Sequence, residues 1–161
     1  MTPDKQKMKI TRIENGTVID HINPGSALKV FSILGLDEDE ESSITIAIRV
    51  NSGKMDEKDL LKIEDKFLTP KESAMIALIS PEATINIIRS FEVDAKHPVE
   101  LPEKLTGIFD CDNPNCITNQ EREPVEPQFE VATKEDLSVR CLYCDNLMDE
   151  DQVTHQLVKE S

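Results

Sequence analysis

The chain has 161 residues, enough for one ordinary domain or two small ones, and its formal net charge is −14. No apolar run approaches the roughly 20 residues of a membrane-spanning helix, so no membrane association is expected. The charge is uneven: residues 1–101 carry 13 Lys and Arg against 18 Asp and Glu, and residues 102–161 carry 5 against 14. Nucleic-acid binding relies on Lys and Arg that neutralise phosphates, so the acidic second half disfavours that class of partner.

The chain begins with short strands and a helix. Residues 8–23 have the pattern of two short extended segments around an Asn-Gly turn. A helix is predicted to start at Pro24, with Asn23 as its cap, and to end at Gly35.

The next part of the chain predicts four strands and a second helix. Residues 43–50 alternate apolar and polar side chains, as a half-buried strand does, and residues 60–64 follow as its neighbour. Residues 69–72, Thr-Pro-Lys-Glu, form a capping box with Pro at the first helical position. Strands are expected again over residues 84–88 and 91–96. The helix that begins at the capping box is expected to bury Ala74, Met75, Leu78 and Ile79.

This order of elements predicts an α+β fold, in which two helices cover one face of a mainly antiparallel sheet. An extended, Pro-bearing segment, residues 97–102, then leads to a region of Cys, Pro and acid. We therefore expect two domains, residues 1–100 and residues 101–161. Short strands are predicted in the second domain near 105–109, 128–132 and 138–140, followed by a tail helix from Asp149 that buries Val153 and Leu157.

All four cysteines of the chain lie in two tight pairs, Cys111 with Cys116 and Cys141 with Cys144. Each pair closes a short turn, and the stretch between the pairs is long enough for a β-hairpin that brings them together. Zn²⁺ prefers four tetrahedral ligands and binds thiolate well, so the pattern indicates a closed structural site without an open catalytic position. The second domain is too small to rely on an apolar core alone, and metal binding would supply its folding energy.

Two other uses of the cysteines remain open at this point. A disulfide framework needs an oxidising compartment, whereas the polar start of the chain predicts no secretory signal and a cytoplasmic protein. A redox pair of Cys141 and Cys144 would leave Cys111 and Cys116 without a role.

No catalytic motif is found in the sequence: no nucleophile elbow, no Gly-rich phosphate loop and no His in a metal-binding pattern. Four charged positions near predicted strand ends are candidates for binding a phosphorylated ligand: Asp20, His21, Lys62 and Lys96. The simpler interpretation is that they are exposed charges on strands. Neighbours on a regular strand point to opposite faces, so Asp20 and His21 can share a site only if the strand ends or kinks there.

Three segments and the cysteine pattern together resemble a known family. The segments are Gly16-Thr-Val-Ile-Asp-His-Ile22, Lys58-Asp-Leu-Leu-Lys-Ile-Glu64 and Pro81-Glu-Ala-Thr-Ile-Asn86. In this order, and with the four cysteines, they closely resemble the regulatory chain of aspartate carbamoyltransferase, over a match that runs from about Ile10 to Cys144.

The resemblance implies a non-catalytic subunit that tunes pyrimidine biosynthesis. In that family an N-terminal αβ sandwich binds CTP, ATP and UTP, with Mg²⁺ expected beside the phosphates, and a C-terminal domain carries one structural Zn²⁺. Regulatory chains form homodimers through the allosteric domain, and their zinc domains hold catalytic trimers in a dodecamer. The signs of the effectors do not transfer, because the N-terminal residues differ from the family.

The resemblance also implies roles for individual residues. Lys96 and His21 would contact the phosphates, and Asp20 and Lys62 the ribose. Ile13 and Phe91 would approach the base, with Phe91 standing where Tyr is familiar. Further members of the nucleotide site would be Ile10, Thr11, Val18, Leu60, Asn86, Ile88 and Val93. The metal ligands would be Cys111, Cys116, Cys141 and Cys144.

A nucleotide-sensing regulatory subunit is therefore the first hypothesis. A zinc-ribbon interaction or transcription-type protein is the alternative, which the acidic second half disfavours, and a stand-alone enzyme is the third.

Overall fold

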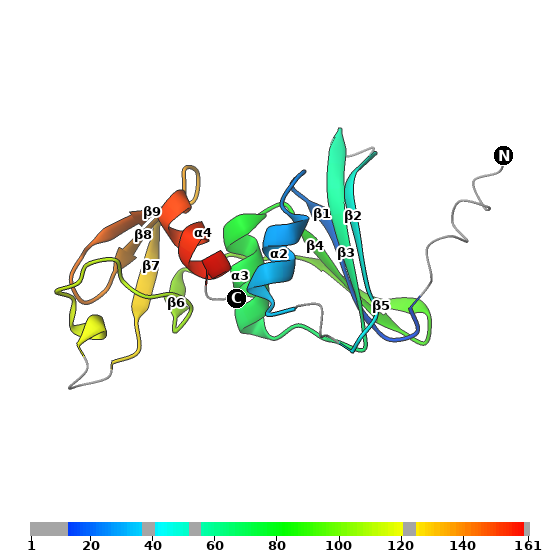
Figure 1. The fold of residues 1–161 in the computed structure, drawn as a ribbon, viewed down its shortest axis with the longest axis horizontal. Helices are drawn as coiled ribbons and strands as arrows, with labels where there is room; N and C mark the ends of the chain where they lie inside the picture. The colour runs from blue at the N-terminus through cyan, green and yellow to red at the C-terminus, as the bar shows by residue number, and fades with distance from the viewer. Residues whose placement is uncertain (1–12, 37–40, 52–55, 121–124, 160–161) are drawn as a thin grey trace.

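A computed structural model describes residues 13–36, 41–51, 56–120 and 125–159 and contains two antiparallel sheets (Figure 1). The first sheet has five strands in the order β2-β3-β1-β4-β5. Its strands are β1 Gly16–Ile22, β2 Ile44–Asn51, β3 Glu57–Glu64, β4 Thr84–Arg89 and β5 Glu92–Pro98. The predicted α+β class with mainly antiparallel pairing is thus confirmed.

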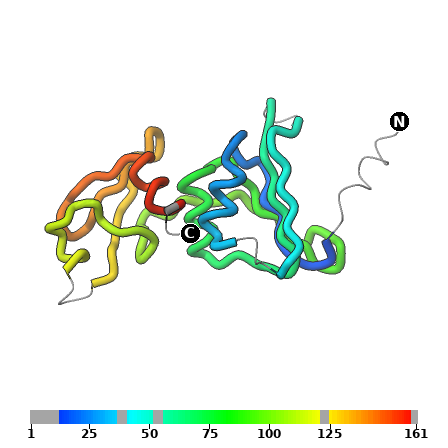
Figure 2. The backbone as a smooth tube through the Cα atoms, in the orientation of Figure 1, coloured from blue at the N-terminus to red at the C-terminus, as the bar shows by residue number. Residues whose placement is uncertain are grey.

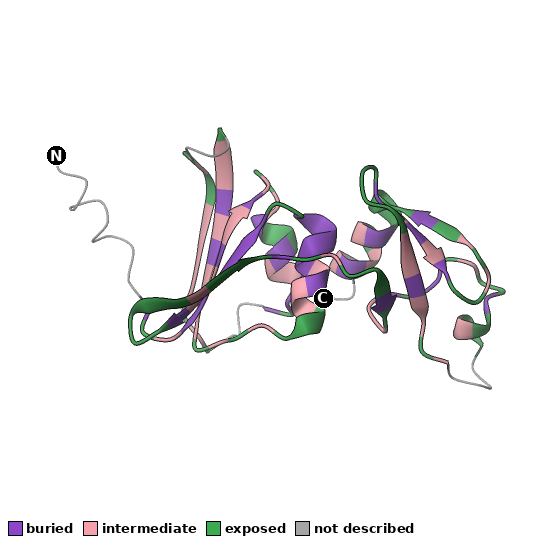
Figure 3. Ribbon diagram, turned by 180° about the vertical axis from the view of Figure 1, so that it is seen from behind, coloured by how far each residue is buried: buried purple, intermediate pink, exposed green. Residues whose placement is uncertain are grey.

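Two helices, α2 Ala27–Ile33 and α3 Pro70–Ile79, cover one face of this sheet. That face is apolar: Ile19, Leu61 and Ile63 are fully buried and belong to one cluster with the buried side chains of the helices. No helix of the described residues lies on the opposite face, and edge strand β5 is exposed along most of its length (Figure 3). Because side chains alternate along a strand, every second residue of β1, β3 and β4 points away from the helices.

Asp59 organises the end of the sheet where β1 and β2 become irregular. Its carboxylate is fully buried and accepts hydrogen bonds from three backbone N–H groups, those of Gly25 (2.8 Å), Ala27 (2.9 Å) and Arg49 (2.8 Å). The pairing of β1 with β3 shifts between Ile19 and Ile22, and the pairing of β2 with β3 shifts nearby. A buried carboxylate that satisfies three donors holds both irregular strand ends in place.

The two helices begin and pack slightly differently from the prediction. α2 begins at Ala27 and not at Pro24, because the carbonyl of Asn23 accepts from Ser26 N (2.9 Å) and closes a turn first. The capping box of α3 is present as predicted. Ile76 is fully buried in α3, whereas Met75, expected in the core, is only partly buried. No described helix is long and apolar enough to cross a membrane.

The second sheet has four strands in the order β6-β7-β8-β9, and a last helix follows it. These elements are β6 Lys104–Thr106, β7 Gln128–Thr133, β8 Ser138–Cys141, β9 Leu147–Asp149 and α4 Glu150–Lys159, with a 3-10 turn η1 at Ile117–Asn119. The sequence interpretation missed β9 but predicted α4, in which Val153 and Leu157 are buried as expected.

α4 connects the two parts of the molecule (Figure 2). It lies against α2 and α3, although more than a hundred residues separate it from α2 in the sequence. One hydrophobic cluster extends across both sheets. Residues 97–102, which the sequence suggested as a hinge between the two domains, begin inside β5, which runs to Pro98, and Val99 N donates to Ala83 O at 3.0 Å.

Candidate metal centre and ligand-binding face

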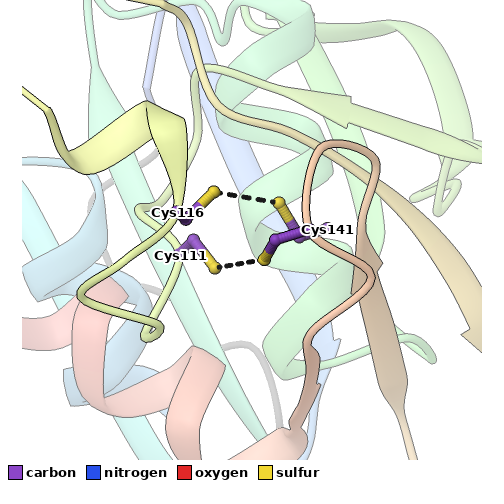
Figure 4. Close-up of side chains that lie close together, drawn as sticks. Cys111, Cys116 and Cys141 are labelled. Atoms are coloured by element: carbon purple, nitrogen blue, oxygen red, sulfur yellow. Dashed lines mark hydrogen bonds between the residues drawn. The ribbon is translucent and has the colours of Figure 1, made fainter.

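The four cysteines come together beside the second sheet, and Figure 4 labels three of them, Cys111, Cys116 and Cys141. All four Sγ atoms lie within 4.8 Å of one another. The Cys111–Cys144 and Cys116–Cys141 Sγ–Sγ distances are both 3.6 Å, far longer than a disulfide bond of about 2.05 Å. A tetrahedral Zn²⁺ with Zn–S bonds of about 2.3 Å requires sulfurs about 3.8 Å apart, so the arrangement fits one such ion.

The surroundings of the sulfurs include hydrogen-bond donors for thiolates. Asn113 N donates to Cys111 Sγ at 3.5 Å, and Thr118 Oγ1 donates to Cys116 Sγ at 3.2 Å. Burial raises the pKa of Cys111 to about 12. At Cys144 burial also acts to raise the pKa, but hydrogen bonds, led by that of the Asn113 side chain, outweigh it and lower the pKa to about 7. A metal ion favours the thiolate form of the cysteines that bind it, so a bound cation would lower the pKa of Cys111.

A second arrangement lies on the helix-free face of the first sheet, where four of the predicted residues form a row across the strands. Val18 of β1 pairs with Lys62 of β3 on one side and with Asn86 of β4 on the other. Asn86 in turn pairs with Lys96 of β5, and its Nδ2 donates to Val18 O at 3.3 Å. Directly paired residues present their side chains on the same face, so two lysines flank an amide and a valine here.

We call the face of the first sheet that carries this row the open face, and other predicted residues lie around the row. Leu60 is two positions before Lys62, and Ile88 is two positions after Asn86, so the side chains of both point to the same face of the sheet as the row. Ile88 pairs with Val93, and the irregular pairing between Ile87 and Ile88 keeps Val93 on the same face as Lys96.

Phe91 lies in the tight turn between β4 and β5, where it has a φ of 68° and is 50% exposed. Its N–H donates to Glu14 O at 2.9 Å, which places the segment after Ile13 beside this turn. Ile13 itself is buried but is absent from the helix-side cluster. The predicted residues Ile10 and Thr11 lie outside the described part of the chain.

Asp20 and His21 are brought together by an irregularity in β1, as a shared site requires. His21 has a φ of 55°, and its Nδ1 lies 3.8 Å from Asp20 Oδ2. This buried Nδ1 has no hydrogen-bond partner among the described residues. Asp20 Oδ1 accepts from His21 N at 2.7 Å and lies 2.8 Å from Lys58 Nζ.

The sequence interpretation missed Lys58 as a neighbour of this site. The signal was an alternation of Lys58, Leu60 and Lys62 along one strand, which puts all three on one face. Burial lowers the pKa of Lys62, although the charge of Asp20 opposes this effect. The open face therefore combines three lysines and a histidine with the carboxylate of Asp20, a set that suits a ligand with several negative charges and hydroxyl groups.

Comparison with known proteins identifies the family. A family model described as "Aspartate carbamoyltransferase regulatory chain, allosteric domain" matches residues 8–100, and one described as "Aspartate carbamoyltransferase regulatory chain, metal binding domain" matches residues 103–154. The chain belongs to the aspartate carbamoyltransferase regulatory chain family. Its resemblance to this family, first suggested by the sequence motifs, is thus confirmed.

Several regulatory chains of this family are similar over nearly their whole length. The aspartate carbamoyltransferase regulatory chain of Thermoplasma volcanium is 47% identical over 150 residues, which cover 93% of this chain and 98% of that one. The regulatory chain of Thermofilum pendens is 47% identical over 154 residues, covering 96% and 97%. That of Pyrococcus furiosus is 46% identical over 152 residues, covering 94% and 99%. The family match to the metal-binding domain ends at residue 154, within α4.

Proposed function

We propose that this chain is a non-catalytic regulatory subunit of a cytoplasmic aspartate carbamoyltransferase, in which it binds CTP, ATP and UTP and tunes pyrimidine biosynthesis. The observation that carries the proposal is the cross-strand row of Lys62, Val18, Asn86 and Lys96 on the open face. A row of this kind offers separated cations beside apolar side chains, and a nucleotide has separated phosphates and a base.

The phosphates would bind at the cationic positions of the open face. Lys96 is exposed on edge strand β5, and His21, whose buried Nδ1 has no hydrogen-bond partner among the described residues, would supply a second contact. A triphosphate carries a charge near −4, so Mg²⁺ is expected to bind with it and offset part of that charge. The net charge of −14 makes such local compensation necessary.

The ribose and the base would occupy the rest of the face. Asp20 uses Oδ1 for Lys58 and the backbone, which leaves Oδ2 to accept from a ribose hydroxyl, with Lys62 close by. The base would lie toward the turn at Phe91, where Ile13, Ile88 and Val93 contribute apolar surface. Backbone groups at that turn would distinguish purine from pyrimidine by their donor and acceptor pattern.

The four cysteines would hold one Zn²⁺, whose role is to stabilise the fold of the second sheet. Four thiolates close the coordination shell, so the ion would contribute no chemistry to a reaction. The segments beside the four cysteines expose four large apolar side chains, those of Ile117, Leu142, Tyr143 and Leu147. We propose that this surface docks the catalytic chain, because exposed apolar groups that gather at one end of a domain are typical of protein interfaces.

The assembly follows from the same proposal. Two chains would pair through their allosteric domains, and the metal-binding domains would hold catalytic trimers together in a dodecamer. Each effector must bind the two quaternary arrangements with different affinities, by a typical coupling of about 1–3 kcal/mol. No nucleic acid or membrane partner is part of this proposal.

The substitution Lys96→Ala tests the nucleotide site. Because Lys96 is exposed on an edge strand, the change should leave the fold intact and remove one charge-assisted contact, worth about 1.5–3 kcal/mol, or roughly 10-fold or more in affinity. Calorimetric titration of CTP and ATP into the full chain measures it. Lys71→Ala, which removes the same charge from an exposed position on α3, is the matched control. Normal CTP and ATP affinity in Lys96→Ala would rule out this site.

A further inference from the structure

Two glutamines of α4, which lie one helical turn apart, form hydrogen bonds with the loop that carries Cys111. Gln156 Oε1 accepts from Asp110 N at 2.9 Å, and Gln156 Nε2 donates to Asp110 O at 2.7 Å. One amide side chain thereby satisfies both backbone groups of the residue before Cys111. Gln152 Nε2 donates to the carboxylate of Asp112, the residue after Cys111. Cys111 is therefore held on both sides by the same helix.

Gln152 is itself fixed by the start of α4. Asp149 N donates to Gln152 Oε1 at 2.9 Å, and Gln152 N donates to Asp149 Oδ1 at 2.9 Å, a reciprocal pair of the capping-box type. The Gln152 amide thus caps the helix with its oxygen and holds Asp112 with its nitrogen. A side chain that is already ordered by the cap loses little further freedom when it binds the loop.

The other sides of α4 attach it to the first sheet's helices. Val153 and Leu157 are buried in the shared hydrophobic cluster, and α4 contacts both α2 and α3. Near the end of α4, Ser32 Oγ of α2 donates to Val158 O at 3.3 Å. Figure 1 shows α4 between the second sheet and these two helices. The cysteine loop, α4 and α2 thus form a continuous chain of contacts.

We propose that Gln152 and Gln156 are positioning residues of the metal centre, which fix the Cys111 loop on α4 and, through α4, on α2 and α3. This inference rests on the metal-binding part of the proposed function and needs no nucleotide contact. Hydrogen-bond partners around metal ligands orient those ligands, and their loss typically costs about 10–100-fold in metal affinity. Gln152 lies inside the part of the chain that the family model for the metal-binding domain matches, and Gln156 lies two positions beyond its end at residue 154.

The experiment uses the full chain loaded with Co²⁺, whose visible absorption reports the geometry of a tetrahedral thiolate site. Gln156→Ala removes both hydrogen bonds to Asp110. His155→Ala is the matched control, because it changes an exposed neighbour on the same helix to the same residue. The rate of metal loss to excess chelator is measured well below the unfolding temperature, together with the visible spectrum.

We expect Gln156→Ala to lose metal about 10-fold faster than the unchanged chain, with a shifted spectrum, and His155→Ala to match the unchanged chain. Gln156→Glu keeps an acceptor for Asp110 N but no donor for Asp110 O, so it should lie between them; it carries the test if Gln156→Ala does not fold. An unchanged release rate and spectrum in the Gln156 variants overturns this inference alone. A full chain that takes up no metal overturns the metal part of the proposed function as well.

Discussion

Asp20 shows how single residues shape the open face. Burial acts to raise the pKa of its carboxyl, but hydrogen bonds from Lys58 and from the backbone of His21, and the positive charges of both, outweigh burial and hold the pKa below its ordinary value. The positive φ of His21 turns that residue back toward Asp20. The carboxylate is thus kept ionised beside Lys58, as the proposed contact with ribose hydroxyl groups requires.

The lowered pKa of Asp20 predicts a specific dependence of stability on pH. A carboxyl whose pKa is lower in the folded than in the unfolded chain stabilises the fold above its ordinary pKa, and this contribution disappears as the pH falls through the folded pKa. Asp20→Asn should therefore cost free energy of unfolding at pH 7, and the difference from the unchanged chain should shrink at pH 3. Urea unfolding at both values measures it.

Asp94→Asn serves as the control for this pH test. Asp94 pairs with Arg89 at 3.4 Å, but both side chains are more than half exposed, so this ion pair contributes little. Its substitution should change the free energy of unfolding only slightly at either pH. An equal cost of Asp20→Asn at pH 7 and pH 3 would contradict the proposed role of its charge.

Among the elements, α3 is defined by local signals at its start. Thr69 Oγ1 accepts from Glu72 N at 3.2 Å, and Glu72 Oε1 accepts from Thr69 N at 3.0 Å. Both bonds satisfy N–H groups that would otherwise have no partner within the helix. The helix then places Ile76 and its neighbours on the core face of the sheet, behind the open face.

Removing this cap should destabilise the chain by a predictable amount. Thr69→Ala loses the side-chain acceptor and should lower the free energy of unfolding by about 1 kcal/mol, whereas Thr69→Ser keeps the hydroxyl and should stay close to the unchanged chain. Urea unfolding of the metal-loaded chain at neutral pH is the measurement. Equal stabilities for Thr69→Ala and Thr69→Ser would show that the cap does not stabilise α3.

Features that depend on neighbouring residues could be predicted from the sequence, whereas contacts between distant parts of the chain could not. The cap of α3 is a local pattern, and it was predicted from the sequence. Val18 and Leu60 were expected in the site only from the family resemblance, and the pairing of Val18 with Lys62 comes from the structure. The start of α2 could not be predicted, because buried Asp59, distant in the chain, takes the N–H groups of Gly25 and Ala27.

Contacts at the edge of the site were also beyond the sequence. The ion pair between Lys58 and Asp20 joins β3 to the irregular end of β1, and no local pattern predicts where β1 bends. Similarly, the two cysteine pairs predicted a shared metal, but the grip of Gln156 on Asp110 depends on how α4 packs. Residue type and spacing predicted which cysteines come together, and tertiary packing determined which residues hold them in place.

For the molecule as a whole, the metal centre and the first sheet share one hydrophobic cluster through α4. Metal binding contributes folding energy of order 10 kcal/mol in structural sites of this kind, more than a small sheet gains from its own core. The first sheet has its own core between its strands and two helices. The two parts should therefore respond differently when the metal is removed.

A strong chelator should unfold the second sheet and leave the first largely intact. Hydrogen exchange is expected to accelerate over residues 104–149, to rise moderately in α4, and to change little in β1, β3 and β4. The substitution Cys111→Ser should reproduce this pattern and abolish binding to catalytic trimers while CTP still binds. Unchanged exchange over residues 104–149 after complete metal removal would contradict the structural role of the ion.

The most direct test of the regulatory role is the aspartate carbamoyltransferase activity of purified catalytic trimers, measured with and without this chain while CTP and ATP are varied. The metal-loaded chain should form a complex with the trimers and make their activity depend on these nucleotides, and Lys96→Ala should assemble equally well but weaken that dependence. A complex that forms fully yet has the same activity at every CTP and ATP concentration would contradict the account.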